Sequence, residues 1–246
     1  MLTRRRFISI SALAGVGVLA GCSTDDDEGG GAPASTTAQR SGRRADVIAK
    51  YTAAPMKVAI AGRELSTWGY DSLLPGRELR ARAGDLVEVT YSNDLPEATS
   101  VHWHGLAIVN SMDGVPGLTQ PDIEPGGSFT YRFEVPDPGT YWFHPHHGLQ
   151  LERGLYAPLI VDDPDEHVAV DSEYTLVLDD WLDGTSTSPS DEFERIRQLG
   201  ASMGDTGDMS GMNHDMGGMS MATSPLLGGD AGDAVYPYHL VNGRPA

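Results

Sequence analysis

Two His-x-His elements carry the most distinctive chemistry in this chain. They are His102-Trp103-His104 and, about forty residues later, His144-Pro145-His146. Side chains at positions i and i+2 of a strand project from the same face, so each element offers two imidazoles to one metal ion or to two adjacent ions. On neighbouring strands, all of these imidazoles would converge on one pocket. Imidazole suits copper, zinc, iron and nickel, so the spacing predicts a metal site without choosing the metal.

The elements that must position these histidines are predicted to be strands. Between Phe129 and Val135, apolar residues alternate with polar ones, and Gly and Pro residues separate similar runs elsewhere. This pattern predicts an antiparallel β-sandwich, for which the residues from Tyr51 to Asp163 are sufficient. Pro145 has no amide hydrogen to donate, so the second histidine pair is expected at a strand end or a sheet edge.

The sequence around both histidine pairs resembles the first two copper motifs of the multicopper oxidases. The first motif is Ser-Val-His-Trp-His-Gly at residues 100–105, and the second is Tyr-Trp-Phe-His-Pro-His at residues 141–146, followed by Gly148-Leu149-Gln150. The similarity extends over roughly residues 57–246. It implies an all-β, cupredoxin-like Greek-key sandwich, with one complete domain and the start of a second.

The resemblance also implies a role for each histidine of the two pairs. His102 would ligate a type 2 copper, while His104, His144 and His146 would ligate the paired type 3 coppers. These residues would supply half of the ligands of a trinuclear copper cluster.

Four further residues near or outside these motifs need separate interpretations. Asp113 matches an acidic residue that the family places near the cluster, where a carboxylate can orient a bound water or relay protons. The alternative is that Asp113 only forms the turn before a glycine. We expect His147 to face the opposite side of its strand, and His167 and His239 to be ordinary loop and strand histidines.

Two other ligand motifs of the family, His-x-x-His-x-His and His-Cys-His, do not occur in these 246 residues. A type 1 copper site requires a thiolate, and the only cysteine is Cys22. A single cysteine also excludes an internal disulfide. We therefore expect an N-terminal part of a longer oxidase, with the remainder following Ala246, that is not competent alone.

The N-terminus resembles an export signal with a lipidation site. Residues 3–8 read Thr-Arg-Arg-Arg-Phe-Ile, and an apolar run leads to Leu19-Ala20-Gly21-Cys22. The first part is similar to a twin-arginine signal and the second to a lipobox, so residues 1–21 are expected to be removed and Cys22 to be lipidated. The alternative is cleavage without lipidation. A lipid anchor would hold the protein on the outer face of the bacterial cytoplasmic membrane.

The formal net charge of −18 limits the classes of partner. Removal of the signal would take away three arginines and no acid, which makes the chain still more acidic. Such a chain is a poor ligand for nucleic acid. Its membrane contact is expected through the lipid anchor alone.

Composition divides the mature chain into three parts. Residues 22–50 are polar and glycine-rich and predict a disordered tether. Residues 51–163 form the expected first domain, and residues 164–246 an incomplete second one. In the latter, residues 174–181 predict a buried strand, and Ser188-Pro189 predicts a helix start with Ser188 as cap and an end near Leu199.

Residues 203–221 form a loop that contains six of the nine methionines of the chain. Thioether sulfur is soft and favours Cu(I), and a histidine in the same loop adds a nitrogen donor. Methionine-rich loops also occur in multicopper oxidases that act on cuprous ions. The alternative is a glycine-rich loop without function. The candidate Cu(I) ligands are Met203, Met209, Met212, His214, Met216, Met219 and Met221.

The sequence therefore predicts a copper-dependent oxidoreductase that couples oxidation of a reduced substrate to the reduction of dioxygen to water. Cu(I) is the favoured substrate, which implies copper detoxification, while Fe(II) and phenols are alternatives. A different class of function is a non-catalytic, copper-binding lipoprotein of the cell surface that buffers copper. A zinc site in a cupredoxin-like binding module is less consistent with the methionines, because zinc has little affinity for thioethers.

Overall fold

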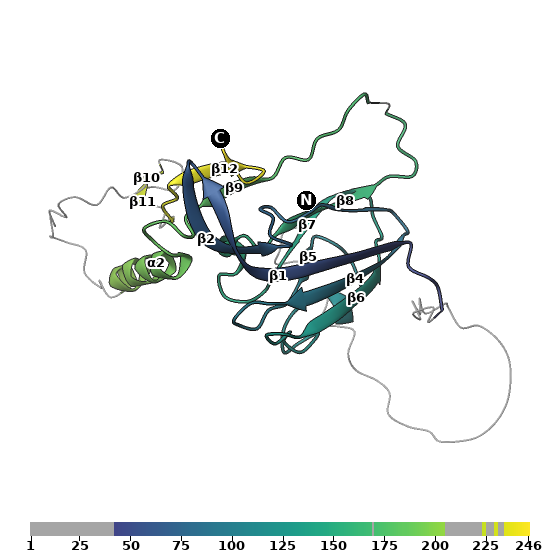
Figure 1. The fold of residues 1–246 in the computed structure, drawn as a ribbon, viewed down its shortest axis with the longest axis horizontal. Helices are drawn as coiled ribbons and strands as arrows, with labels where there is room; N and C mark the ends of the chain where they lie inside the picture. Colours follow the sequence, from purple (N-terminus) through teal and green to yellow (C-terminus); the bar gives the residue numbers. More distant parts are fainter. Residues whose placement is uncertain (1–41, 169, 205–222, 225–228, 231–233) are drawn as a thin grey trace, which may run out of the picture. The chain divides into compact units, whose positions relative to one another are not determined.

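The computed structural model describes residues 42–168, 170–204, 223–224, 229–230 and 234–246. Its largest part is a sandwich of two four-stranded sheets (Figure 1). The first sheet has the order β2-β1-β4-β6. Its strands are β1 (Val47–Ile60), β2 (Arg63–Tyr70), β4 (Leu86–Asn93) and β6 (Ser128–Glu134).

The second sheet has the order β3-β8-β7-β5 and contains both predicted histidine motifs. Its strands are β3 (Leu79–Arg82), β8 (Ala157–Asp162), β7 (Gly139–His144) and β5 (His102–His104). The predicted all-β sandwich is confirmed, but the expectation of purely antiparallel strands is wrong. β1 pairs with β4, and β3 with β8, in parallel. Long connections bring these strands side by side, and local alternation of residues carries no information about them.

Aromatic side chains fill the space between the two sheets. Tyr51, Tyr91, Trp103, Tyr131 and Phe143 are at most 1 % exposed. In β4 and β6 the buried residues alternate with more exposed ones, as the sequence pattern predicted. The interior of the sandwich is therefore built from one face of each strand.

The first domain begins earlier than the sequence predicted. β1 starts at Val47, which lies opposite Val87 of β4, and the amide of Asp46 donates to the carbonyl of Leu86. The boundary expected at residue 51 therefore falls inside β1. The residues before Tyr51 are mostly polar, and this composition concealed the start of the strand. In the structure, Ala49 and Tyr51 already face the core.

The second region consists of a small sheet and one helix. The sheet has the order β13-β12-β9, formed by β9 (Leu178–Trp181), β12 (Tyr238–Val241) and β13 (Arg244–Pro245). A separate pair joins β10 (Thr223–Ser224) and β11 (Gly229–Asp230). Trp181 and Leu240 pack against Ile60 and Leu65, so this sheet shares an apolar cluster with β1 and β2.

Two local expectations for this region need correction. The buried strand predicted at residues 174–181 is shorter, and Tyr174, Leu176 and Leu178 are 82, 67 and 74 % exposed. Apolar composition predicted burial, but the described residues place nothing over these side chains.

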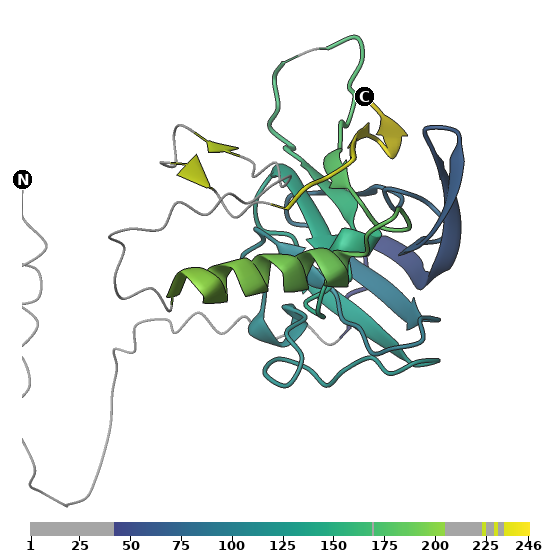
Figure 2. The ribbon, with the colours of Figure 1, turned by 90° about the vertical axis from the view of Figure 1, so that its left-hand side faces the viewer.

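The predicted helix start is confirmed, because Ser188 Oγ accepts a hydrogen bond from the amide of Asp191. The helix, α2 (Pro189–Gly204), is continuous and ends later than Leu199 (Figure 2). An interpretation of the sequence that placed Phe193, Ile196 and Leu199 on one apolar side of this helix is wrong at Phe193, which is exposed. Glu192 is buried instead and accepts from the amide of Val235.

Several predicted features lie outside the described residues. They include the export signal with Cys22 and residues 205–221 of the methionine-rich loop, while Met203 lies in α2. Across the described ranges, no helix combines the length and the apolar character needed to cross a bilayer.

Candidate metal centre

The pairing of β5 with β7 brings the two predicted histidine pairs together. His102 lies opposite His144 in the register, and His146 follows two residues after the end of β7. The ring centroids of His102 and His146 are 4.2 Å apart, and those of His104 and His144 are 5.4 Å apart. Trp103 points away into the core, and the second pair lies at a strand end, as Pro145 predicted.

Backbone carbonyls fix the orientation of two of these rings. His102 Nδ1 donates to the carbonyl of Asp113 at 2.9 Å, and His144 Nδ1 donates to the carbonyl of Pro145 at 2.9 Å. A neutral imidazole with its proton on Nδ1 carries its lone pair on Nε2. Nε2 of both residues is therefore the atom available to a metal, and the carbonyls act as the outer partners typical of metal-binding histidines.

The rings of His104 and His144 face each other directly. His104 Nδ1 lies 3.1 Å from His144 Nε2. Because the Nε2 atom of His144 carries the lone pair, His104 donates a proton into the space between the two rings. Both rings would be able to hold copper, with each imidazole offering one nitrogen once its proton lies on the other.

Burial keeps the second histidine pair neutral. Loss of hydration lowers the pKa of His144 to about 4, the hydrogen bond to the Pro145 carbonyl opposes this only in part, and the neighbouring histidines add to the lowering. Burial, followed by the charge of His102, also lowers the pKa of His146. Metal ions bind the neutral form of imidazole, so both side chains are in the binding form near neutral pH.

The four imidazoles fit copper as donors, but they do not complete a site. In the part of the chain that the structure describes, no three His, Cys, Asp or Glu side chains are placed to hold one metal ion. The arrangement instead offers imidazoles in pairs. An ion held by such a pair needs further ligands from elsewhere.

Asp113 lies next to this cluster, as the sequence predicted. It ends a short 3-10 helix, η1 (Asn110–Met112), and its carboxylate Oδ1 lies 3.3 Å from His102 Nδ1. Its turn position and its contact with His102 are compatible with each other. A role in proton relay stays a prediction.

The histidines that the sequence assigned to other roles lie outside this cluster. His147 Nε2 lies 2.8 Å from Asp122 Oδ1, and His239 Nδ1 lies 2.6 Å from Asp180 Oδ1. His167 is exposed in a loop.

Sequence reasoning missed Trp142 as part of the site. Its ring stacks on His104 with a centroid distance of 4.9 Å and on His144 at 4.3 Å. Trp142 precedes His144 by two residues on the same strand, so period-two reasoning places both on one face and would have found it.

Comparisons with known proteins agree with this geometry. Residues 52–166 match the family model described as multicopper oxidase. Over 98 % of its length, the chain is 42 % identical to the multicopper oxidase MmcO of Mycobacterium tuberculosis and covers 47 % of that protein. Over 52 % of its length, it is 44 % identical to copper resistance protein A of Pseudomonas syringae pv. tomato, of which it covers 21 %.

A solved structure gives the same result. The chain resembles the multi-copper oxidase from Pseudomonas Thermotolerans with a TM-score of 0.59 and 31 % identity, over 80 % of this chain and 41 % of that one. The chain belongs to the multicopper oxidase family. It spans less than half the length of these relatives.

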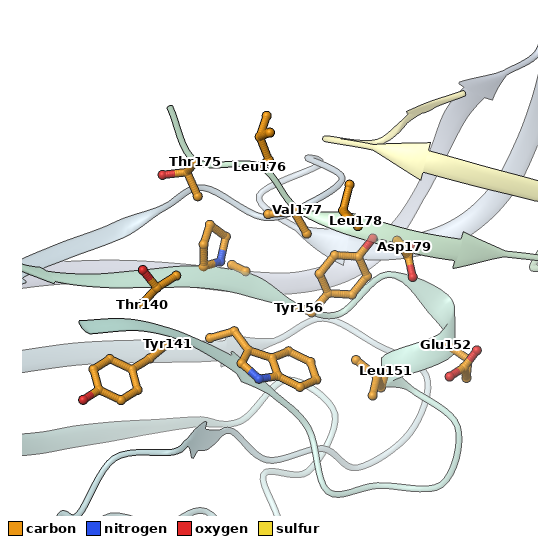
Figure 3. Close-up of a pocket in the computed structure, with 13 residues that line it drawn as sticks. Thr140, Tyr141, Leu151, Glu152, Tyr156, Thr175, Leu176, Val177, Leu178 and Asp179 are labelled. Atoms are coloured by element: carbon orange, nitrogen blue, oxygen red, sulfur yellow. Dashed lines mark hydrogen bonds between the residues drawn. The ribbon is translucent and has the colours of Figure 1, made fainter. Parts of the chain in front are cut away.

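In this multicopper oxidase chain, a cleft of about 400 Å³ lies between β7 and the start of β8 on one side and the segment leading into β9 on the other (Figure 3). Tyr156 and Asp179 face each other across it, and the hydroxyl of Tyr156 donates to the carboxylate of Asp179. Burial, assisted by the nearby charge of Glu152, raises the pKa of Asp179 to about 6. Asp179 therefore joins the sandwich to the second region through a bond whose energy depends on pH.

Asp179→Asn is expected to stabilise this oxidase chain by about 1 kcal/mol at pH 8 and by much less at pH 4.5. The folded state binds a proton at Asp179 more tightly than the unfolded state does. The stability that the protonated carboxyl of Asp179 contributes to the wild-type protein is therefore complete below the unfolded pKa near 3.8 and is lost as the pH rises through 6. Asparagine still accepts from Tyr156 and carries no charge. Urea unfolding at both pH values measures the difference.

The matched control is Asp137→Asn, because Asp137 is an exposed carboxylate in the turn between β6 and β7. This control is expected to change the free energy of unfolding equally little at pH 4.5 and pH 8. An equal gain at both pH values for Asp179→Asn would show that burial does not hold its proton.

Proposed function

We propose that this chain supplies the first cupredoxin domain of a copper-dependent oxidase that couples the oxidation of a reduced substrate, Cu(I), to the reduction of dioxygen to water. The observation that supports the proposal is the cluster of four imidazoles, with ring centroids 4.2 to 5.6 Å apart. The family membership of the chain supports the same chemistry.

In this proposal His102 holds a type 2 copper, and His104, His144 and His146 hold part of a type 3 pair. A trinuclear copper cluster, when bound, supplies the electrons that reduce dioxygen. Because the chain offers imidazoles in pairs, each ion takes its remaining ligands from outside the described residues. The copper centre would then form at an interface.

The protein contributes orientation, exclusion of water and proton handling at this site. The carbonyls of Asp113 and Pro145 hold two imidazoles with Nε2 directed inward. Trp142 stacks on His104 and His144 and shields one side of their rings. The carboxylate of Asp113, beside His102, is the group placed to pass protons toward the site.

Cu(I) is the substrate best supported by composition. The methionines of residues 203–221, together with His214, offer soft donors, and glycines between them permit a loop to wrap around an ion. One relative carries the name copper resistance protein A. In this proposal the loop captures Cu(I), and the physiological role is copper detoxification outside the cytoplasm, with the protein exported and anchored through a lipid on Cys22.

The test is Cu(II) binding by the full chain, followed by electron paramagnetic resonance and by titration. Replacing His104 and His144 by alanine is expected to change the nitrogen hyperfine coupling of the copper signal, because two of the four imidazoles are lost, and to lower the bound copper by at least one ion per chain. The matched control is His147→Ala, because His147 is adjacent to the cluster and pairs with Asp122 instead. Equal binding by the double variant and by wild type would refute the proposal.

A second candidate is a non-catalytic copper-binding lipoprotein that buffers copper. The specific observation in its favour is that Cys22 is the only cysteine, so the chain offers no thiolate for a type 1 copper in the sandwich. Both candidates predict copper binding. Oxygen uptake driven by Cu(I), measured in a polypeptide that also carries type 1 ligands, is expected for the oxidase alone.

A further inference from the structure

The side chain of Gln150 is buried and uses all of its polar groups. Its relative exposure is 1 %. Oε1 accepts from Thr99 Oγ1 at 2.7 Å, while Nε2 donates to Glu97 Oε1 at 2.9 Å and to the carbonyl of Ala98 at 2.7 Å. The carboxamide of Gln150 therefore forms hydrogen bonds with all three residues, 97–99, that lead toward the first histidine pair.

The backbone of Gln150 belongs to the turn that follows the second histidine pair. Its amide donates to the carbonyl of His147 at 3.0 Å, and its carbonyl accepts from Arg153, the last residue of the 3-10 helix η2 (Leu151–Arg153). A second hydrogen bond also joins the two histidine segments: the amide of His146 donates to Ser100 Oγ at 3.2 Å. The two histidine segments are thus tied together beyond the sheet.

The β-ladder alone does not fix the position of His146. β5 is an edge strand of three residues, and β7 ends at His144, so His146 lies beyond the last ladder pair. Its ring nevertheless stacks on His102 with a centroid distance of 4.2 Å. The hydrogen bonds of Gln150 and Ser100 bridge these two segments.

We propose that Gln150 is a positioning residue for the copper centre and that its carboxamide sets the separation of His146 from His102. This inference rests on the proposed function. A carboxamide is required because it offers one acceptor and two donors at once. Glutamate would direct a carboxylate at the Glu97 carboxylate and at the Ala98 carbonyl, and leucine would leave the buried hydroxyl of Thr99 and the carbonyl of Ala98 without this partner.

The test compares Gln150→Leu and Thr99→Val with Thr67→Val. Thr67 and Thr99 are both at most 2 % exposed, and the hydroxyl of Thr67 donates to the carbonyl of Arg153 and contacts Asp183. Thr67→Val therefore removes a comparable buried hydroxyl at the far end of η2. It leaves the contacts of the residues that lead to His102 unchanged. The readouts are the affinity for Cu(II) alone, its paramagnetic resonance spectrum, and urea unfolding.

Gln150→Leu and Thr99→Val are expected to lower Cu(II) affinity roughly tenfold, at the low end of the loss caused by removing groups that directly orient metal ligands, because they act on the histidines only through the backbone. Their spectra should show altered or mixed nitrogen coupling. Thr67→Val is expected to lose stability but to keep the wild-type affinity and spectrum.

Wild-type Cu(II) affinity and spectrum in Thr99→Val and Gln150→Leu would overturn the inference, and so would an equal loss of affinity in Thr67→Val. If Gln150→Leu does not fold, Thr99→Val decides, because it removes a single hydroxyl, which contacts Gln150 Oε1 and the Ser100 carbonyl, and keeps the side-chain volume. The failure of the proposed function is seen separately, as wild-type protein whose copper signal does not depend on His104 and His144.

Discussion

Trp103→Ala is expected to lower the free energy of unfolding by about 3–5 kcal/mol. Trp103 is completely buried, and its ring centroid lies 4.8 Å from that of Phe133 and 5.1 Å from that of Phe143. Alanine would leave a cavity at the centre of the sandwich, between two histidines of the same short strand. Urea unfolding, followed by far-ultraviolet circular dichroism, measures the loss.

The control for this prediction is Trp142→Ala. Trp142 lies on β7, the neighbour of β5, but is only half-buried and stacks on histidine rings at the outer face. It is expected to lose less than half as much free energy as Trp103→Ala. Similar losses in the two variants would mean that burial does not determine the contribution of these tryptophans.

Among substitutions of glycine by alanine, Gly114→Ala is expected to cause a large loss of stability. Gly114 has a φ of +77°, and a Cβ atom there would lie 1.7 Å from the carbonyl oxygen of Val101. The clash requires movement of the backbone that leads into His102. We expect the free energy of unfolding to fall by at least about 3 kcal/mol, of which strain in φ explains only part. We also expect weaker Cu(II) binding.

Gly117→Ala isolates the effect of the clash. Gly117 has a similar φ of +72°, but a Cβ atom there meets nothing within 4 Å. In this control the free energy of unfolding is expected to fall by about 1 kcal/mol, from backbone strain alone, and the Cu(II) affinity is expected to stay unchanged. Thermal unfolding and copper titration compare the two variants. Losses of the same size at both positions would contradict the role assigned to the Val101 contact.

The convergence of the histidines could be predicted from sequence because it depends on a simple periodicity. Residues at i and i+2 share a face, and proline inside the second pair marks a strand end. Both expectations hold in the register of His102 opposite His144. The alternation between Phe129 and Val135 predicted the buried face of β6 for the same reason.

Features that depend on distant partners could not be predicted in this way. Gln150 carries no periodic signal, and its importance is visible only when residues 97–99 lie against it. The burial of Glu192 likewise depends on the amide of Val235, far along the chain. The exposed apolar residues at Tyr174 and Leu176 show the converse error, because composition predicts burial only where another element covers the side chain.

The parallel pairs of the sandwich have a consequence for the kinetics of folding. Leu79 pairs with Leu159 and Val47 with Val87, so large loops must close before these contacts form. β5 and β7 are also joined by a long connection rather than by a tight hairpin. Sheets with such non-local contacts fold slowly, and the histidine pairs meet only after the chain has closed. Copper would therefore act on an already folded scaffold, slowing its unfolding rather than nucleating its formation.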